Sequence, residues 1–141
     1  MNAHIGEAGV HNRIERCLRV VTELGRRIFG TRAKISDWYS VSFDEDYIYR
    51  SSHPPREAGF DDQLGWPDIE RICFVATDFM SSDEIVIFTN SRPESYLIPM
   101  EAQGAADLWS EILNRGLFGA ELAVEAMCSP DGIFCWPDPS G

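Results

Sequence analysis

At 141 residues the chain has the usual length of one domain, and 44% hydrophobic residues with eight Phe, four Tyr and four Trp exclude global disorder. Its net charge of −11 is unevenly distributed: residues 10–34 carry seven basic and two acidic side chains, a net +5, whereas residues 35–141 carry five Arg and twenty Asp and Glu, a net −15. An acidic body repels phosphates and argues against nucleic acid as a direct ligand. No apolar run approaches the roughly 18 residues that a transmembrane helix needs.

The N-terminal segment has two parts. Residues 1–9 are small and polar, and we expect a loose terminus. Over residues 10–29 the apolar side chains recur every three or four positions, which predicts a basic amphipathic helix that ends before Gly30. We expect this helix to pack on its own domain or to join two copies in a homodimer; docking on an anionic membrane surface is the alternative. The apolar stripe consists of Val10, Ile14, Cys17, Leu18, Val21, Leu24, Ile28 and Phe29.

A strand hairpin is predicted next. Aromatic and β-branched residues alternate with serines over residues 39–43, three acidic residues interrupt, and a strand-prone run resumes over residues 47–49. Residues 51–65 contain two adjacent prolines, two glycines and two aspartates, so they read as an irregular loop of unusual length. Loops of that length are commonly functional or mobile. Trp66-Pro67-Asp68 ends it, and Trp66 is expected to support the core.

The rest of the chain predicts strands followed by helices. Strands are expected over residues 69–79, 85–88 and 95–98, and the second of these is apolar at every position, as in a central strand covered on both faces. A helix begins at Ala105 and ends at Gly116, a shorter one with Leu122, Ala123, Ala126 and Met127 inward follows, and residues 133–136 form a last strand.

These elements predict a single α+β domain over residues 1–141. We expect an antiparallel sheet of about five to six strands, an N-terminal amphipathic helix and two C-terminal helices, because no stretch alternates strand and helix as a parallel sheet requires. Residues 35–141 would form its acidic body.

The sequence offers no catalytic residue, metal ligand set or cofactor motif. The acidic turn at residues 44–46 lacks the Gly and Glu that complete a calcium loop, and the three histidines lack the spacing of a zinc site. His53 with Asp61 as a general base is the one pairing we weigh, and a surface histidine without a catalytic task is favoured. All four cysteines are expected to be free thiols. These thiols, and the charges where an export signal needs apolar residues, predict a cytoplasmic protein.

The candidate partner-binding residues are exposed acids and one aromatic. A like-charged turn carries a field that attracts a basic partner, and interface cores favour aromatics surrounded by charge. The candidates are Asp44, Glu45, Asp46, Phe60, Asp61 and Asp62.

The order of elements over residues 38–137 resembles that of a group of small uncharacterised bacterial α+β proteins. The features shared are the Trp66-Pro67-Asp68-Ile69-Glu70-Arg71-Ile72 junction, the strand at residues 85–88, Ile98-Pro99, the helix around Leu108 to Leu113 and the Phe134-Cys135-Trp136 end. Proteins similar to these have no assigned catalytic residues, and some small acidic domains of this kind are immunity proteins that accompany bacterial toxins.

This resemblance and the acidic body together favour a non-enzymatic domain that binds a protein partner with a basic surface, such as an immunity protein or inhibitor of a basic toxin. Two alternatives remain: a small enzyme or ligand-binding domain that uses the 51–65 loop, and a membrane-peripheral module docked by the N-terminal helix.

Overall fold

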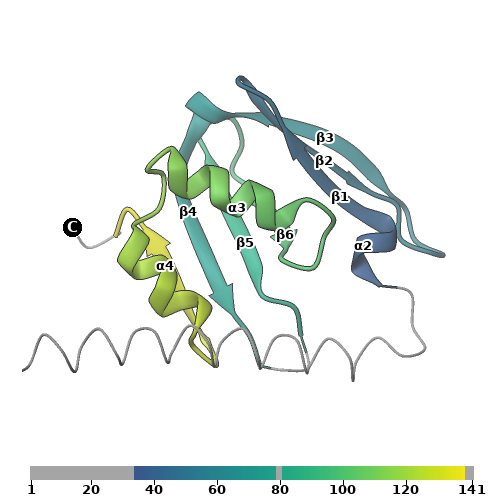
Figure 1. The fold of residues 1–141 in the computed structure, drawn as a ribbon. Helices are drawn as coiled ribbons and strands as arrows, with labels where there is room; N and C mark the ends of the chain where they lie inside the picture. Colours follow the sequence, from purple (N-terminus) through teal and green to yellow (C-terminus); the bar gives the residue numbers. More distant parts are fainter. Residues whose placement is uncertain (1–33, 79–80, 139–141) are drawn as a thin grey trace, which may run out of the picture.

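The computed structural model describes residues 34–78 and 81–138, which form two antiparallel sheets and two longer helices (Figure 1). The elements in chain order are α2 (Ile35–Trp38), β1 (Tyr39–Phe43), β2 (Tyr47–Ser52), β3 (Phe60–Gly65), the 3-10 helix η1 (Trp66–Asp68), β4 (Ile69–Ala76), β5 (Glu84–Thr89), β6 (Tyr96–Pro99), α3 (Ala105–Asn114), α4 (Ala120–Met127) and β7 (Gly132–Trp136). The α+β class is confirmed. In place of one sheet of five to six strands, the described residues form seven strands, in one sheet of three and one of four. The predicted terminus 1–9 and helix 10–29 lie outside the described residues.

Strands β1, β2 and β3 form a meander, here called the β1–β3 sheet. Its hairpin is the one predicted from the alternation of residues 39–43: Tyr39 and Val41 are buried, whereas Ser40 and Ser42 are not. The short helix α2 before it was not predicted. In α2 the Asp37 carboxylate accepts a hydrogen bond from the Lys34 backbone N–H at 3.0 Å, which stabilises the first turn.

The irregular loop predicted over residues 51–65 is wrong for most of its length. β2 continues through Ser52, β3 begins at Phe60, and the two pair from Tyr47↔Gly65 to Ser52↔Phe60, so only residues 53–59 connect them. The period of β3 is hard to see in the sequence because this sheet has one polar face. Asp61 and Gln63 are exposed on that face.

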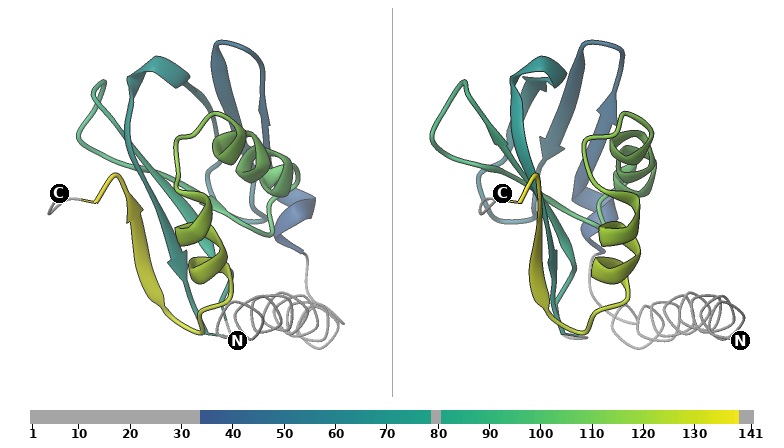
Figure 2. Two further views of the ribbon diagram at one scale, coloured as in Figure 1. Left: turned by 60° about the vertical axis from the view of Figure 1, so that its left-hand side comes forward. Right: turned by 90° about the vertical axis from the view of Figure 1, so that its left-hand side faces the viewer.

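The second sheet has the strand order β6-β5-β4-β7 and is called here the β4–β7 sheet. Its inner face carries the fully buried Ile72 and Phe74 of β4 and Ile85 and Ile87 of β5. Helices α3 and α4 lie on this side of the strands (Figure 2). On the opposite, outer face Phe88 is 38% exposed in the described part of the chain. Strand β5 therefore has the all-apolar sequence of a doubly covered strand but only one covered face among the described residues.

One hydrophobic core includes residues from both sheets and both helices. The Trp109 ring of α3 lies between Phe74 and Phe118, with ring centroids 5.1 and 4.9 Å away. Trp66 is 6% exposed, in agreement with its expected place in the core. Both C-terminal helices are confirmed, with one exception on α4: Met127 is 41% exposed instead of turned inward. Its sulfur accepts a hydrogen bond from Trp109 Nε1 at 3.2 Å, so it covers the edge of the core.

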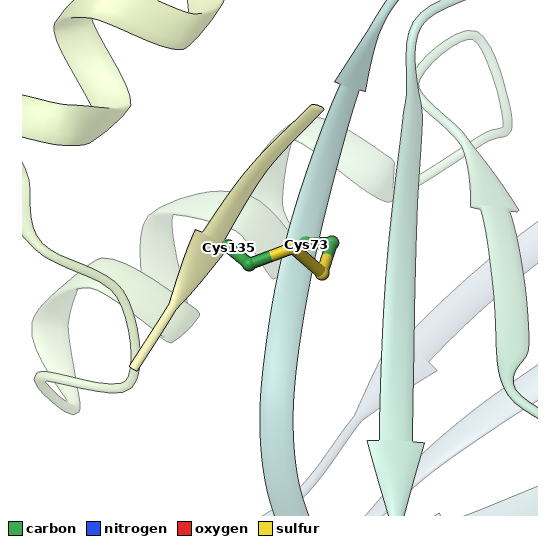
Figure 3. The surroundings of a disulfide bond; sticks show 2 residues. All are labelled: Cys73 and Cys135. Carbon is green, nitrogen blue, oxygen red and sulfur yellow. A yellow bond between two sulfur atoms is a disulfide. The ribbon is translucent and has the colours of Figure 1, made fainter. Parts of the chain in front are cut away.

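The prediction of four free thiols is wrong, because Cys73 of β4 and Cys135 of β7 form a disulfide (Figure 3). The two cysteines are paired in register on neighbouring antiparallel strands, which puts their Cα atoms 4.0 Å apart and both side chains on the outer face. Their separation of 62 residues gave no signal in the sequence. Cys128 forms no disulfide with another described residue, and Cys17 lies outside the described residues. The predicted cytoplasmic location is therefore no longer supported by an expectation of four reduced thiols.

Candidate functional site

The structure distributes the candidate partner-binding residues over the two ends of the β1–β3 sheet. Asp44, Glu45 and Asp46 form the turn between β1 and β2, beside the Tyr47↔Gly65 pair. Phe60, Asp61 and Asp62 belong to β3, near the Ser52↔Phe60 pair at the other end of β2. About four residues of extended strand, or about 13 Å, separate the two groups. They do not form one cluster, and within β3 the side chains of Phe60 and Asp62 lie on the inner face of the sheet, whereas that of Asp61 lies on the outer face.

Within the turn, Asp44 has a structural role. Its carboxylate accepts hydrogen bonds from the backbone N–H groups of Asp46 and Tyr47, both at 2.8 Å, and from the Tyr49 hydroxyl at 2.6 Å. The bond from Tyr49 and those from the backbone hold the pKa of the Asp44 carboxyl below its usual value. The exposed acids left to meet a partner at this end are therefore Glu45 and Asp46.

Asp62 also has a structural partner, the side chain of Arg50. Arg50 is 7% exposed and donates two hydrogen bonds to the Asp62 carboxylate, at 2.8 and 2.6 Å. Its remaining nitrogen donates to the Leu97 carbonyl of β6 at 3.0 Å, and the Tyr39 hydroxyl donates to the same carbonyl at 2.6 Å. This cluster joins the two sheets.

Aromatic rings enclose the Arg50 guanidinium. Its central carbon lies 4.6 Å from the Phe60 ring centroid and 4.8 Å from that of Tyr96, both favourable for a cation–π interaction. Burial raises the pKa of the Tyr39 phenol, and the nearby Arg50 charge opposes that effect. Phe60 is still 39% exposed, so it covers the ion pair and presents an apolar edge to solvent.

Asp61 lies on the outer face, where it holds two neighbouring side chains. The Ser51 hydroxyl donates to one carboxylate oxygen at 2.6 Å, and His53 Nε2 lies 3.0 Å from the other. These bonds, that from Ser51 first, lower the pKa of the Asp61 carboxyl. The serine and the histidine both contact the carboxylate, so the histidine is not placed to take the serine proton. The His53–Asp61 pair weighed from the sequence therefore exists, with both side chains more than half exposed, at 60% and 68%.

A shallow hollow of about 410 Å³ lies on this face. Its lining residues all carry polar side chains, although apolar atoms make up more of the exposed lining than polar atoms do; these residues are Ser40, Ser42, Tyr49, Arg50, Ser51, Asp61, Asp62 and Gln63. The sequence analysis missed Ser40, Ser42, Tyr49 and Gln63, although the serine alternation in the predicted hairpin already placed the first two on one face. The arrangement suits hydrogen bonding to a polar surface.

A second group of carboxyls lies at the end of the β4–β7 sheet where β4 ends and β5 begins. Asp83 accepts a hydrogen bond from the Thr77 backbone N–H at 3.0 Å, and Glu84 pairs in register with Pro99. Burial raises the pKa of Asp83, Glu84 and Glu101, and the Asp83 charge raises that of Glu101 further. No group of three His, Cys, Asp or Glu residues in the described ranges could hold a metal ion.

Comparison with protein-family models, with curated proteins and with solved structures gave no match. Among helices in the described part of the chain, none is long and apolar enough to cross a membrane.

Proposed function

We propose that this chain is a non-enzymatic protein-binding domain that recognises a basic partner through the outer face of the β1–β3 sheet. The partner we favour is a bacterial toxin, which the domain would neutralise as an immunity protein. The observation that carries the proposal is the composition of this face: a shallow hollow whose lining residues all carry polar side chains, with exposed acids at both of its ends. Exposed carboxylates accelerate encounter with a basic surface, and the hydrogen-bonding groups between them give specificity.

An exposed aromatic side chain supports an interface at the same place. Tyr47 is 40% exposed and lies on the outer face at one end of the β2–β3 pair, whereas Phe60, 39% exposed, lies on the inner face with Asp62 and Leu64. Tyrosine and phenylalanine are enriched in interface cores, because they bury a large area with few rotatable bonds.

The test distinguishes acidic residues that would contact the partner from acidic residues that stabilise the fold. Glu45→Lys/Asp46→Lys and Asp61→Lys change exposed acids of the face and leave the Asp44 and Arg50–Asp62 interactions in place. Glu121→Lys/Glu125→Lys on α4 is the control, because it makes the same charge change at exposed positions on another element. After affinity capture of the partner from the native host, association rates should fall for the face variants by about tenfold, since rim charges act mainly on encounter. Equal rates for face and control variants would contradict the proposal.

The His53–Asp61 contact favours a second candidate function, that of a small enzyme or ligand-binding domain. A carboxylate that orients a histidine ring is a common arrangement for a general base. The supporting result would be turnover of ester or phosphoester substrates by the wild-type protein but not by His53→Ala. The openness of the site to water and the shortness of the 53–59 connection favour the binding function instead.

A further inference from the structure

We infer that residues 10–29 of this chain dock as a helix on the outer face of the β4–β7 sheet and cover it. The inference concerns the body's own N-terminal segment and does not depend on the partner proposed above. Four independent features of the described residues support it: the chemistry of the face, the sequence of β5, the position of α2 and the distribution of charge.

The outer face is apolar and contiguous. The register places Leu97, Val86 and Cys73 side by side across three strands, and Cys135 continues the row on β7. Val75 and Ile133 form a second row, and Phe88 lies beyond the first. Three of these side chains are notably exposed: Leu97 by 41%, Phe88 by 38% and Ile133 by 70%. Contiguous apolar surface of this kind marks an interaction site.

Strand β5 has the sequence of a strand that is covered on both faces. Its residues 85–88 are all apolar, yet α3 and α4 cover only the side of Ile85 and Ile87. A strand with one face in water normally alternates apolar and polar residues. The second cover is therefore expected to come from residues that the structure does not describe, and 33 of these precede Lys34.

The geometry lets the N-terminal segment reach this face. Residues 30–34 span at most about 17 Å when extended, and a helix of 20 residues is about 30 Å long. Tyr39, five residues after Lys34, donates a hydrogen bond to the backbone carbonyl of Leu97 on edge strand β6. Figure 2 places α2 on the side of the β4–β7 sheet that carries α3 and α4, so the segment before it would pass the edge of the sheet to reach the outer face.

Charge favours this occupant and gives it an orientation. The N-terminal segment carries net +5 and residues 35–141 carry net −15. On the outer face Glu84 lies in the Val75 row, and Asp83 and Glu101 lie nearby at that end, whereas Arg71 lies opposite Phe88 at the other end. Burial raises the pKa of all three acids, so basic side chains beside them would stabilise their ionised forms. Arg26, Arg27 and Arg32, next to the start of the body, would supply that charge.

Amide hydrogen exchange of the full chain tests the inference. We expect protection over residues 10–29 in the wild-type protein and a loss of about tenfold or more in Phe88→Asp and in Ile133→Asp, because each removes an apolar contact and buries a charge. Val124→Asp on α4 is the matched control, since Val124 is also 38% exposed but lies on another element, and it should retain the protection. Exchange in β4 and β5 in the same samples reports whether each variant is folded. If Phe88→Asp unfolds β4 and β5, the protection measured in Ile133→Asp, a substitution at the sheet edge, decides the test.

Several results would overturn the inference. Exchange of residues 10–29 at the rate of an unstructured peptide in the wild-type chain would contradict it, as would equal protection in the face variants and in the control. Protection that rises with protein concentration would assign the face to a second copy of the chain. Protection that appears only with vesicles containing an anionic lipid would assign the segment to a membrane surface.

Discussion

Asp61 and Asp62 are neighbours in the sequence with opposite roles. Asp62 compensates the charge of a guanidinium that is 7% exposed, whereas the Asp61 side chain is 68% exposed. Two adjacent acids in a strand point to opposite faces, so one belongs to the fold and the other to the surface. A count of acidic residues does not reveal these different roles.

We therefore predict different stabilities for two variants with the same chemical change. Asp62→Asn should lower the free energy of unfolding by about 2–4 kcal/mol, because it leaves the buried Arg50 charge without its counter-ion. Asp61→Asn should change it by no more than about 0.5 kcal/mol, as is usual for an exposed position. Urea unfolding of both variants measures the difference. Similar losses in both would show that Arg50 is not the centre of a structural ion pair.

Gly104 is a second position where one residue determines local structure. Its φ is 86°, and a Cβ there would contact the carbonyl oxygen of Val41. Gly104→Ala should therefore destabilise the fold by more than Gly116→Ala, where φ is 71° but no atom lies within 4 Å of the added Cβ. The control should cost about 1 kcal/mol for the left-handed backbone alone, and the Gly104 variant at least twice as much. Thermal unfolding of the pair would refute this if the two losses were equal.

The partly buried carboxyls at the end of the β4–β7 sheet predict a pH dependence. Burial raises the pKa of Glu101, so the folded chain binds this proton more tightly than the unfolded chain does. Its contribution to stability is thus present at low pH and is lost as the pH rises through the folded-state pKa. Glu101→Gln should stabilise the protein at pH 7 by a few tenths of a kcal/mol, a small effect because the group is partly solvated.

The size of that gain should fall as the pH approaches about 4, where the wild-type carboxyl is protonated in both states. Glu94→Gln, at an exposed position, is the control and should show no such dependence. Denaturant unfolding at several pH values measures both. A gain that is independent of pH would show that burial of the Glu101 charge is not its cause.

At the level of elements, the sequence predicted those whose apolar period is strong. The alternation of Tyr39, Val41 and Phe43 predicted β1, and the apolar runs predicted β4, β5 and β7. Strand β3 was missed because Asp61 and Gln63 face water and Asp62 meets Arg50, so its apolar period is reduced to Phe60 and Leu64. Such strands are determined by tertiary partners that lie on other elements, and these partners cannot be read from a local window.

The candidate site was predictable in part for the same reason. The sequence placed exposed acids at Glu45, Asp46 and Asp61, but could not show that Asp44 and Asp62 form hydrogen bonds within the fold. The disulfide depends on the register of β4 against β7, which is likewise a property of the sheet and not of the spacing of the cysteines.

The disulfide links strand β7 to strand β4, and we expect it to contribute to the free energy of unfolding. It closes a segment with a sequence separation of 62 residues, and such a link restricts the unfolded chain. Reduction should lower the free energy of unfolding by about 2–4 kcal/mol. Mass spectrometry of unreduced proteolytic peptides should first recover Cys73 linked to Cys135. Recovery of both as alkylated thiols from protein prepared without reductant would contradict the bond.

For the whole molecule, charge distribution links the proposed function to a measurable rate. Glu45→Lys/Asp46→Lys and Glu121→Lys/Glu125→Lys both change the net charge from −11 to −7, so they differ only in where the charge is lost. Raising the ionic strength from about 0.01 M to about 0.15 M shortens the screening length from about 30 Å to about 8 Å. Over this range the association rate of the wild-type chain with its basic partner should fall by about tenfold or more, with little change in dissociation. The α4 variant should keep most of this salt dependence, whereas the turn variant should lose most of it, because local charges at the interface act at close approach. Stopped-flow or surface-based kinetics with the captured partner would measure this, and an association rate that does not respond to salt would show that the acidic surface does not steer binding.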